Sequence, residues 1–118
     1  MYSEKNNMNI NNIPKEISAS QLNEMIKKGN IIRILDVREP MEWDICHIEN
    51  AENIPMNLIH ECIDKISKET LTVVVCHHGV RSRNVIHYLE EKGYQNLINL
   101  KGGIHSWAQD IDPNMTKY

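Results

Sequence analysis

The sequence lacks a long apolar segment and any excess of positive charge. No apolar run approaches the ~20 residues that a membrane-spanning helix requires. The 118 residues include 13 Lys and Arg against 16 Asp and Glu, a net charge of −3, which argues against a nucleic-acid-binding surface. Residues 1–12 are polar and rich in Asn, without the apolar core of a signal peptide. We therefore expect a cytoplasmic protein with a disordered tail over residues 1–12, and neither membrane nor nucleic acid as a partner.

Cysteine is scarce, and its three positions fit neither a disulfide framework nor a metal motif. Cys46, Cys62 and Cys76 form an odd set without CxxC spacing. In a reducing compartment we expect three free thiols, with no metal and no cofactor. Cys62 falls in a segment with apolar residues at helical period, residues 56–67, and is expected to pack there as a small hydrophobe.

The chain also lacks an internal repeat or a low-complexity linker, so we place one domain over residues 13–118. Aliphatic and β-branched runs alternate with segments of helical period. This alternation predicts an α/β fold with right-handed crossovers and a mainly parallel sheet covered by helices on both faces. Strands are expected over 31–37, 51–55, 71–76 and 97–100, and helices over 18–29, 41–44, 56–67, 82–92 and around residue 107.

The clearest strand ends on Cys76, before a short loop and a helix that we expect to open at Ser82. In parallel sheets, sites form outside the carboxyl ends of the strands. Unpaired N–H groups at a helix N-terminus favour a thiolate and can hold an anion against it. Gly79 permits a backbone conformation closed to other residues, and Arg81 adds a fixed positive charge. We therefore expect an ionised, solvent-accessible thiol at the bottom of a ring of amides from residues 77–81.

An activated thiolate beside an anion site suits a small anion whose outer sulfur can be attacked. Thiosulfate meets this description: Cys76 takes the sulfane sulfur, sulfite leaves, and the persulfide passes its sulfur to a second nucleophile. The residues alone therefore favour a cysteine-based sulfurtransferase.

Several segments resemble, in order, those of the rhodanese homology domain, and together they cover roughly residues 14–113. They are Leu35-Asp-Val-Arg-Glu-Pro40 with Glu42-Trp43, His47-Ile48 and Ala51-Glu-Asn-Ile-Pro55, the active-site loop Val75-Cys-His-His-Gly-Val-Arg-Ser82, and the closing segment Lys101-Gly-Gly-Ile-His-Ser-Trp107. The resemblance implies a five-stranded parallel sheet and transfer of sulfane sulfur from thiosulfate or a persulfide donor. Acceptors would be cyanide, a small thiol, a thioredoxin-like protein or a sulfur-carrier protein.

The resemblance also implies roles for individual residues. Cys76 would be catalytic, and the substrate would be bound by His77, His78, Gly79, Val80, Arg81 and Arg38. Structural support would come from Asp36, His47 and Ser82. Arg38 alternatively pairs with Glu39 or Glu42, and at least one of His77 and His78 is expected to contribute only its backbone.

One departure from the family pattern is Cys46, which stands where glycine usually precedes His47-Ile48. It is either a tolerated small residue or a second thiol within reach of Cys76, able to resolve a persulfide or to form a regulatory disulfide.

Three other functions are compatible with parts of the sequence. A phosphatase or arsenate reductase of the same fold would use a longer loop than the Cys-x4-Arg spacing from Cys76 to Arg81. A binding module or a sulfur carrier that does not detoxify would share the fold, although binding modules of this kind often lack the cysteine. A metal site built from Cys76, His77, His78 and His47 matches no zinc spacing.

Overall fold

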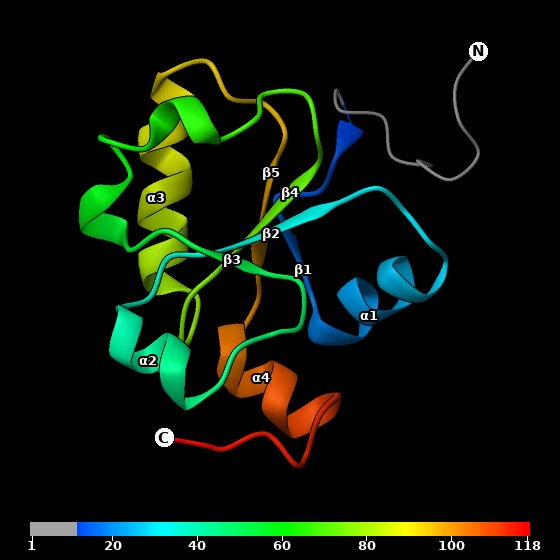
Figure 1. The fold of residues 1–118 in the computed structure, drawn as a ribbon. Coiled ribbons are helices and arrows are strands. Elements are labelled where there is room, and N and C mark those ends of the chain that lie inside the picture. The colour runs from blue at the N-terminus through cyan, green and yellow to red at the C-terminus, as the bar shows by residue number, and fades with distance from the viewer. Residues whose placement is uncertain (1–11) are drawn as a thin grey trace.

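The computed structural model describes residues 12–118, so residues 1–11 of the expected tail lie outside the described part. The chain forms one five-stranded sheet with the strand order β1-β5-β4-β2-β3, and every neighbouring pair is parallel. The strands are β1 Glu16–Ile17, β2 Arg33–Asp36, β3 Glu52–Asn53, β4 Thr72–Val75 and β5 Leu97–Leu100. The expected α/β fold with a parallel sheet is confirmed (Figure 1).

Helices cover the sheet on both faces. They are α1 Ala19–Lys27, α2 Pro40–Ile45, α3 Val80–Glu91 and α4 Gly103–Asp110, with two 3₁₀ turns, η2 Met56–Leu58 and η3 Ile63–Lys65. Helices α1 and α4 pack on one face, and α3 packs on the other beside the two 3₁₀ turns (Figure 1). No helix of residues 12–118 is long and apolar enough to cross a membrane.

The central strand β4 supplies both faces of the core because its side chains alternate. Val73 and Val75 belong to the apolar cluster under α1 and α4. Val74 and Cys76 belong to the cluster under α3. The alternation therefore directs the cysteine that follows β4 toward the N-terminus of α3.

Two helix expectations differ from the structure. The capping box at Ser18 and Gln21 begins α1 as expected, with reciprocal bonds of 3.1 and 2.8 Å. Residues 56–67, however, form no long helix, only the turns η2 and η3. The carbonyls of Ile63 and Ile66 instead accept bonds of 3.0 and 2.8 Å from the hydroxyl of Tyr94. The Tyr94 hydroxyl thus ties the loop after α3 to the second of these turns.

Cys62 lies in this segment and is half-buried against the α3-side cluster, so it packs as expected although not on a helix. Helix α3 also begins earlier than expected, at Val80 rather than Ser82. The loop between Cys76 and α3 is therefore shorter than the sequence indicates.

Candidate active site

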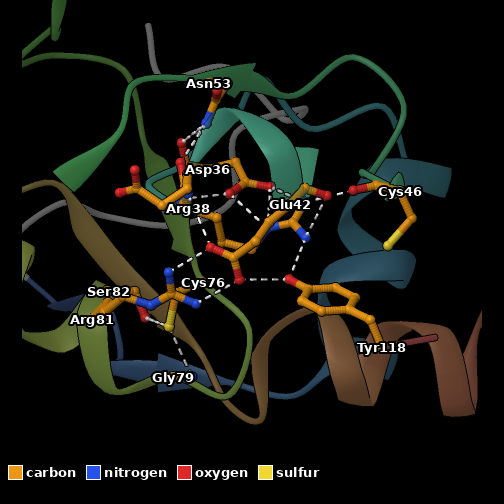
Figure 2. Close-up of polar contacts among 11 residues, drawn as sticks. Asp36, Arg38, Glu42, Cys46, Asn53, Cys76, Gly79, Arg81, Ser82 and Tyr118 are labelled. Atoms are coloured by element: carbon orange, nitrogen blue, oxygen red, sulfur yellow. Dashed lines mark hydrogen bonds and ion pairs between the residues drawn. The ribbon is translucent and has the colours of Figure 1, made fainter. Parts of the chain in front are cut away.

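The loop after β4 places Cys76 beside the first turn of α3. Gly79 is the residue before the helix and has φ = 105°, a conformation that residues with a side chain rarely adopt. This conformation turns the amide of Gly79 back to the cysteine, and its N–H donates to Sγ at 3.0 Å. Ser82, one turn into α3, brings its Oγ to 3.3 Å from the same sulfur (Figure 2). The sulfur is thus held from two sides.

The environment of Cys76 favours its thiolate. Burial raises the pKa of the thiol. Hydrogen bonds from the Ser82 side chain and from the amides of Ser82, Gly79 and His78 lower it, and together they outweigh burial, so the pKa lies below its usual value. The expectation of an accessible sulfur is wrong, since Cys76 is only 1% exposed. The loop and α3 close around the sulfur, so in this conformation only a small group reaches it.

Helix α4 fixes the other side of the loop. The amides of Ile104 and His105 donate to the carbonyls of Cys76 and His77 at 2.9 and 3.1 Å. Gly103 allows this approach, because a Cβ there would lie 2.2 Å from the Cys76 carbonyl oxygen. The Gly102-Gly103 pair was noted in the sequence only as the start of a helix, and its role in seating the cysteine loop becomes visible only in the structure.

Arg81 lies next to the sulfur, but its guanidinium is already paired. Its two terminal nitrogens donate to Glu42 at 2.6 and 2.9 Å (Figure 2). The hydrogen bonds from Arg81 lower the pKa of Glu42 to about 2 against the opposing effect of burial, and the pair raises the pKa of Arg81. The positive charge stands close enough to Cys76 to interact with its thiolate. The sequence analysis did not place Glu42 in the site.

Arg38 is not placed to bind substrate. It is fully buried, and its nitrogens donate to the carboxylate of Asp36, the carbonyls of Glu42 and Cys46, and the hydroxyl of Tyr118. Burial lowers the pKa of Arg38, but the bonds to Asp36 and Tyr118 raise it by more, so the net pKa lies above its usual value. Arg38 therefore ties β2, α2 and the C-terminal segment together. The alternative prediction, that Arg38 forms an ion pair with Glu39 or Glu42, is also wrong, because its ion pair is with Asp36.

Asp36 lies at the end of β2, under the loop that leads to α2. Its Oδ1 also accepts the N–H of Arg38 at 3.0 Å, and Asn53 donates to the carbonyls of Asp36 and Arg38 at 3.0 Å each. These contacts hold the end of β2 against β3.

The two loop histidines differ in their surroundings. His77 is half-buried and stacks on the ring of Tyr118, with centroids 4.0 Å apart and planes 9° apart. Burial and the neighbouring His78 lower the pKa of His77, so it is neutral at neutral pH. His78 and Val80 are exposed. Tyr118 also donates to Glu42 at 2.9 Å, which makes it a second residue of the site that sequence reasoning missed.

His47 and Cys46 lie away from the sulfur of Cys76. His47 stacks on Trp43 at 3.8 Å and donates from Nδ1 to the Trp43 carbonyl at 2.9 Å. Cys46 packs against the cluster under α1 and α4, on the face opposite Cys76, and lies well apart from Cys76 in Figure 2. The hypothesis of a second thiol within reach of Cys76 is therefore wrong for this conformation. Among residues 12–118, no three His, Cys, Asp or Glu side chains are grouped to hold a metal ion.

Taken together, the arrangement provides an activated sulfur nucleophile, a backbone amide directed at it, and a nearby guanidinium. Such a group can attack a small electrophile and stabilise negative charge as it develops.

The chain matches proteins of known family along most of its length. The family model of the rhodanese-like domain matches residues 18–110. The thiosulfate sulfurtransferase GlpE of Coxiella burnetii is 36% identical over 93 residues, covering 79% of this chain and 86% of the relative. The crystal structure of a rhodanese-related protein from Thermoplasma volcanium has a TM-score of 0.75 at 34% identity, covering 83% of this chain and 94% of that one.

A longer relative is also similar. The probable adenylyltransferase/sulfurtransferase MoeZ of Mycobacterium tuberculosis is 35% identical over 104 residues, which cover 86% of this chain. The chain spans only 26% of the length of that relative, so the similarity concerns one part of a larger protein. The family model, the relative from Coxiella burnetii and the structural match agree, and the chain belongs to the rhodanese-like domain family.

Proposed function

We propose that this protein transfers sulfane sulfur through a persulfide on Cys76, with thiosulfate as the donor. The observation that carries the proposal is the bond of 3.0 Å from the Gly79 amide to Sγ, in a setting that lowers the pKa of the thiol. An amide directed at the sulfur stabilises the negative charge of a thiolate and, after transfer, that of the persulfide.

The proposed cycle has two displacements. The Cys76 thiolate attacks the outer sulfur of thiosulfate, a new S–S bond forms, and the old S–S bond breaks with its electron pair leaving on sulfite. A nucleophile such as cyanide then attacks the outer sulfur of the persulfide and leaves as thiocyanate, and Cys76 returns as a thiolate. Each step moves one sulfur atom and one electron pair, so no cofactor or external redox agent takes part.

The loop residues divide into two groups in this proposal. The amides of residues 77–80 and the guanidinium of Arg81 face the donor anion, and Ser82 and His47 support the structure. Arg81 contributes its charge and the N–H groups that Glu42 leaves free, since Glu42 accepts one bond from each terminal nitrogen. We expect Arg81→Ala mainly to raise the KM for thiosulfate, and a fall in kcat would report charge stabilised in the transition state.

The decisive experiment is the intact mass of the protein after incubation with thiosulfate. We expect a gain of one sulfur atom, removed again by cyanide, and no gain in Cys76→Ser, since a serine hydroxyl cannot carry sulfane sulfur. Cys62→Ser and Cys46→Ser serve as matched controls and should still gain the sulfur. A gain that survives in Cys76→Ser would reject the assignment.

The acceptor follows from the burial of Cys76. A cysteine that is 1% exposed favours a small acceptor, cyanide or a low-molecular-weight thiol, over the thiol of a folded protein. The similarity to part of MoeZ supports a second candidate, a carrier that receives sulfur from a protein persulfide and delivers it to a thioredoxin-like or sulfur-carrier protein. Turnover with cyanide, glutathione and thioredoxin, compared at equal thiosulfate, separates the two. Hydrolysis of an aryl phosphate would instead indicate a phosphatase.

A further inference from the structure

Beneath the catalytic loop lies a buried polar side chain that the proposed cycle does not use. Asn99 is on β5 and is 2% exposed. Its Nδ2 donates to the Glu16 carboxylate at 3.0 Å and to the Gly79 carbonyl at 3.2 Å. Its Oδ1 accepts a hydrogen bond from the hydroxyl of Ser82. Asn99 therefore contacts two of the residues that surround the sulfur of Cys76.

The partners of Asn99 determine which way its amide group faces. The Glu16 carboxylate and the Gly79 carbonyl only accept hydrogen bonds, so the amide end that faces them is the NH₂ group. The other end is then the carbonyl oxygen, which can only accept. The hydrogen bond between Asn99 and Ser82 is consequently donated by the serine.

A serine hydroxyl has one hydrogen, and here it is donated in the hydrogen bond to the Asn99 oxygen. The lone pairs of Ser82 Oγ remain for the Cys76 sulfur 3.3 Å away, where they accept from an S–H group. Ser82 can donate to a thiolate only when its hydrogen turns from Asn99 to Sγ. The side chain thus presents an acceptor to the thiol and a donor to the thiolate, and Asn99 opposes the second arrangement.

We propose that Asn99 is a positioning residue that competes with the Cys76 thiolate for the Ser82 hydroxyl hydrogen and so weakens the stabilisation that Ser82 gives to that thiolate. The inference rests on the proposed function only in taking Cys76 as the reactive thiol. Removing the Asn99 oxygen should leave the Ser82 hydrogen free for the sulfur and increase the thiolate population at a given pH.

Other charged and titratable groups surround these three residues, and they come from each neighbouring element. They are Glu16 on β1, Arg38 after β2, Glu42 on α2, His77 and His78 in the loop, Arg81 and Arg83 on α3, and His105 on α4. All remain when Asn99 is replaced by an apolar residue. Because the replacement also removes the bonds to Glu16 and to the Gly79 carbonyl, the contribution of Ser82 is separated by repeating it in a Ser82→Ala background.

The test is the pH dependence of Cys76 alkylation by iodoacetamide, followed by mass spectrometry of the Cys76 peptide so that the other thiols do not interfere. The midpoint of this profile reports the ionisation of the Cys76 thiol. Limited access of iodoacetamide to the sulfur lowers only the plateau rate at high pH. In Asn99→Leu we expect the midpoint to move to lower pH. Below the midpoint, the rate relative to its plateau should rise roughly threefold to tenfold, the effect of one added hydrogen bond of ordinary strength.

Two comparisons show whether the effect passes through Ser82. Asn96→Leu removes another fully buried Asn of the segment before β5, bonded to the carbonyls of Ser67 and Thr70, and should leave the midpoint unchanged. In a Ser82→Ala background, Asn99→Leu should no longer move the midpoint. Asn99→Ala, which also removes the oxygen, replaces Asn99→Leu where the larger side chain prevents folding.

A lower midpoint that depends on Ser82 supports the proposal. An unchanged or higher midpoint, or the same shift in the Ser82→Ala background, overturns it. Alkylation needs no sulfur donor, so this result is independent of whether thiosulfate loads Cys76.

Discussion

Replacing Glu42 by Gln tests whether the ion pair at the active-site loop stabilises the fold through its charge. The carboxylate of Glu42 accepts bonds of 2.6 and 2.9 Å from Arg81, 2.9 Å from Tyr118, and 3.0 Å from its own helix cap at Glu39. These contacts lower its pKa from 4.5 to about 2. Because the folded-state pKa is the lower one, the stabilisation is present above pH 4.5 and is lost as the pH falls through 2.

The magnitude follows from the size of this pKa change. A difference of this size corresponds to about 3 kcal/mol at neutral pH, which we reduce to about 2 kcal/mol because Arg81 is partly exposed and screened. More than half of the contribution should be gone by about pH 3. We therefore expect Glu42→Gln to lower the free energy of unfolding by about 2 kcal/mol at pH 7 and by less than half of that near pH 3.

The assay is urea denaturation of both proteins at the two pH values. Glu52→Gln is the matched control, because Glu52 makes a pair of 2.6 Å with Arg33 but its side chain is 53% exposed. That substitution should cost about 0–1 kcal/mol. An equal loss at both pH values, or a loss for Glu42→Gln no larger than for the control, would refute the reasoning.

Three further substitutions test the surroundings of the loop. Arg38→Met should lower the free energy of unfolding by about 3–5 kcal/mol, measured by urea denaturation, because it leaves the buried Asp36 carboxylate without its partner; a loss below about 1 kcal/mol would contradict this. Gly103→Ala should cost about 3 kcal/mol or more and slow sulfur transfer, because its Cβ would meet the Cys76 carbonyl oxygen at 2.2 Å; wild-type stability would exclude the clash. Tyr118→Phe should lower the free energy of unfolding, measured by thermal denaturation, by about 1 kcal/mol, because the ring still stacks but the hydroxyl bonds are lost. An unchanged free energy of unfolding would show that those bonds do not stabilise the fold.

The features that sequence reasoning predicted well are those that depend on neighbouring residues. The capping box at Ser18, the aliphatic run before Cys76 and the glycine of the loop all act within a few positions along the chain. The long helix expected over residues 56–67 is absent, although Ile59 and Ile66 are buried in the cluster under α3. The apolar periodicity thus indicated which side chains are buried, but it did not determine whether the backbone between them is a continuous helix.

The sequence by itself determined a parallel α/β domain and a cysteine at the end of its central strand, because alternation and loop spacing are local properties. Only the tertiary structure decided how far that cysteine is buried and which distant side chains each arginine meets. Arg81 meets Glu42 across 39 positions of the chain, and Arg38 meets Tyr118 across 80. Several carboxylates were available to each arginine, and the packing of β2, α2 and the C-terminal segment around the loop selects among them.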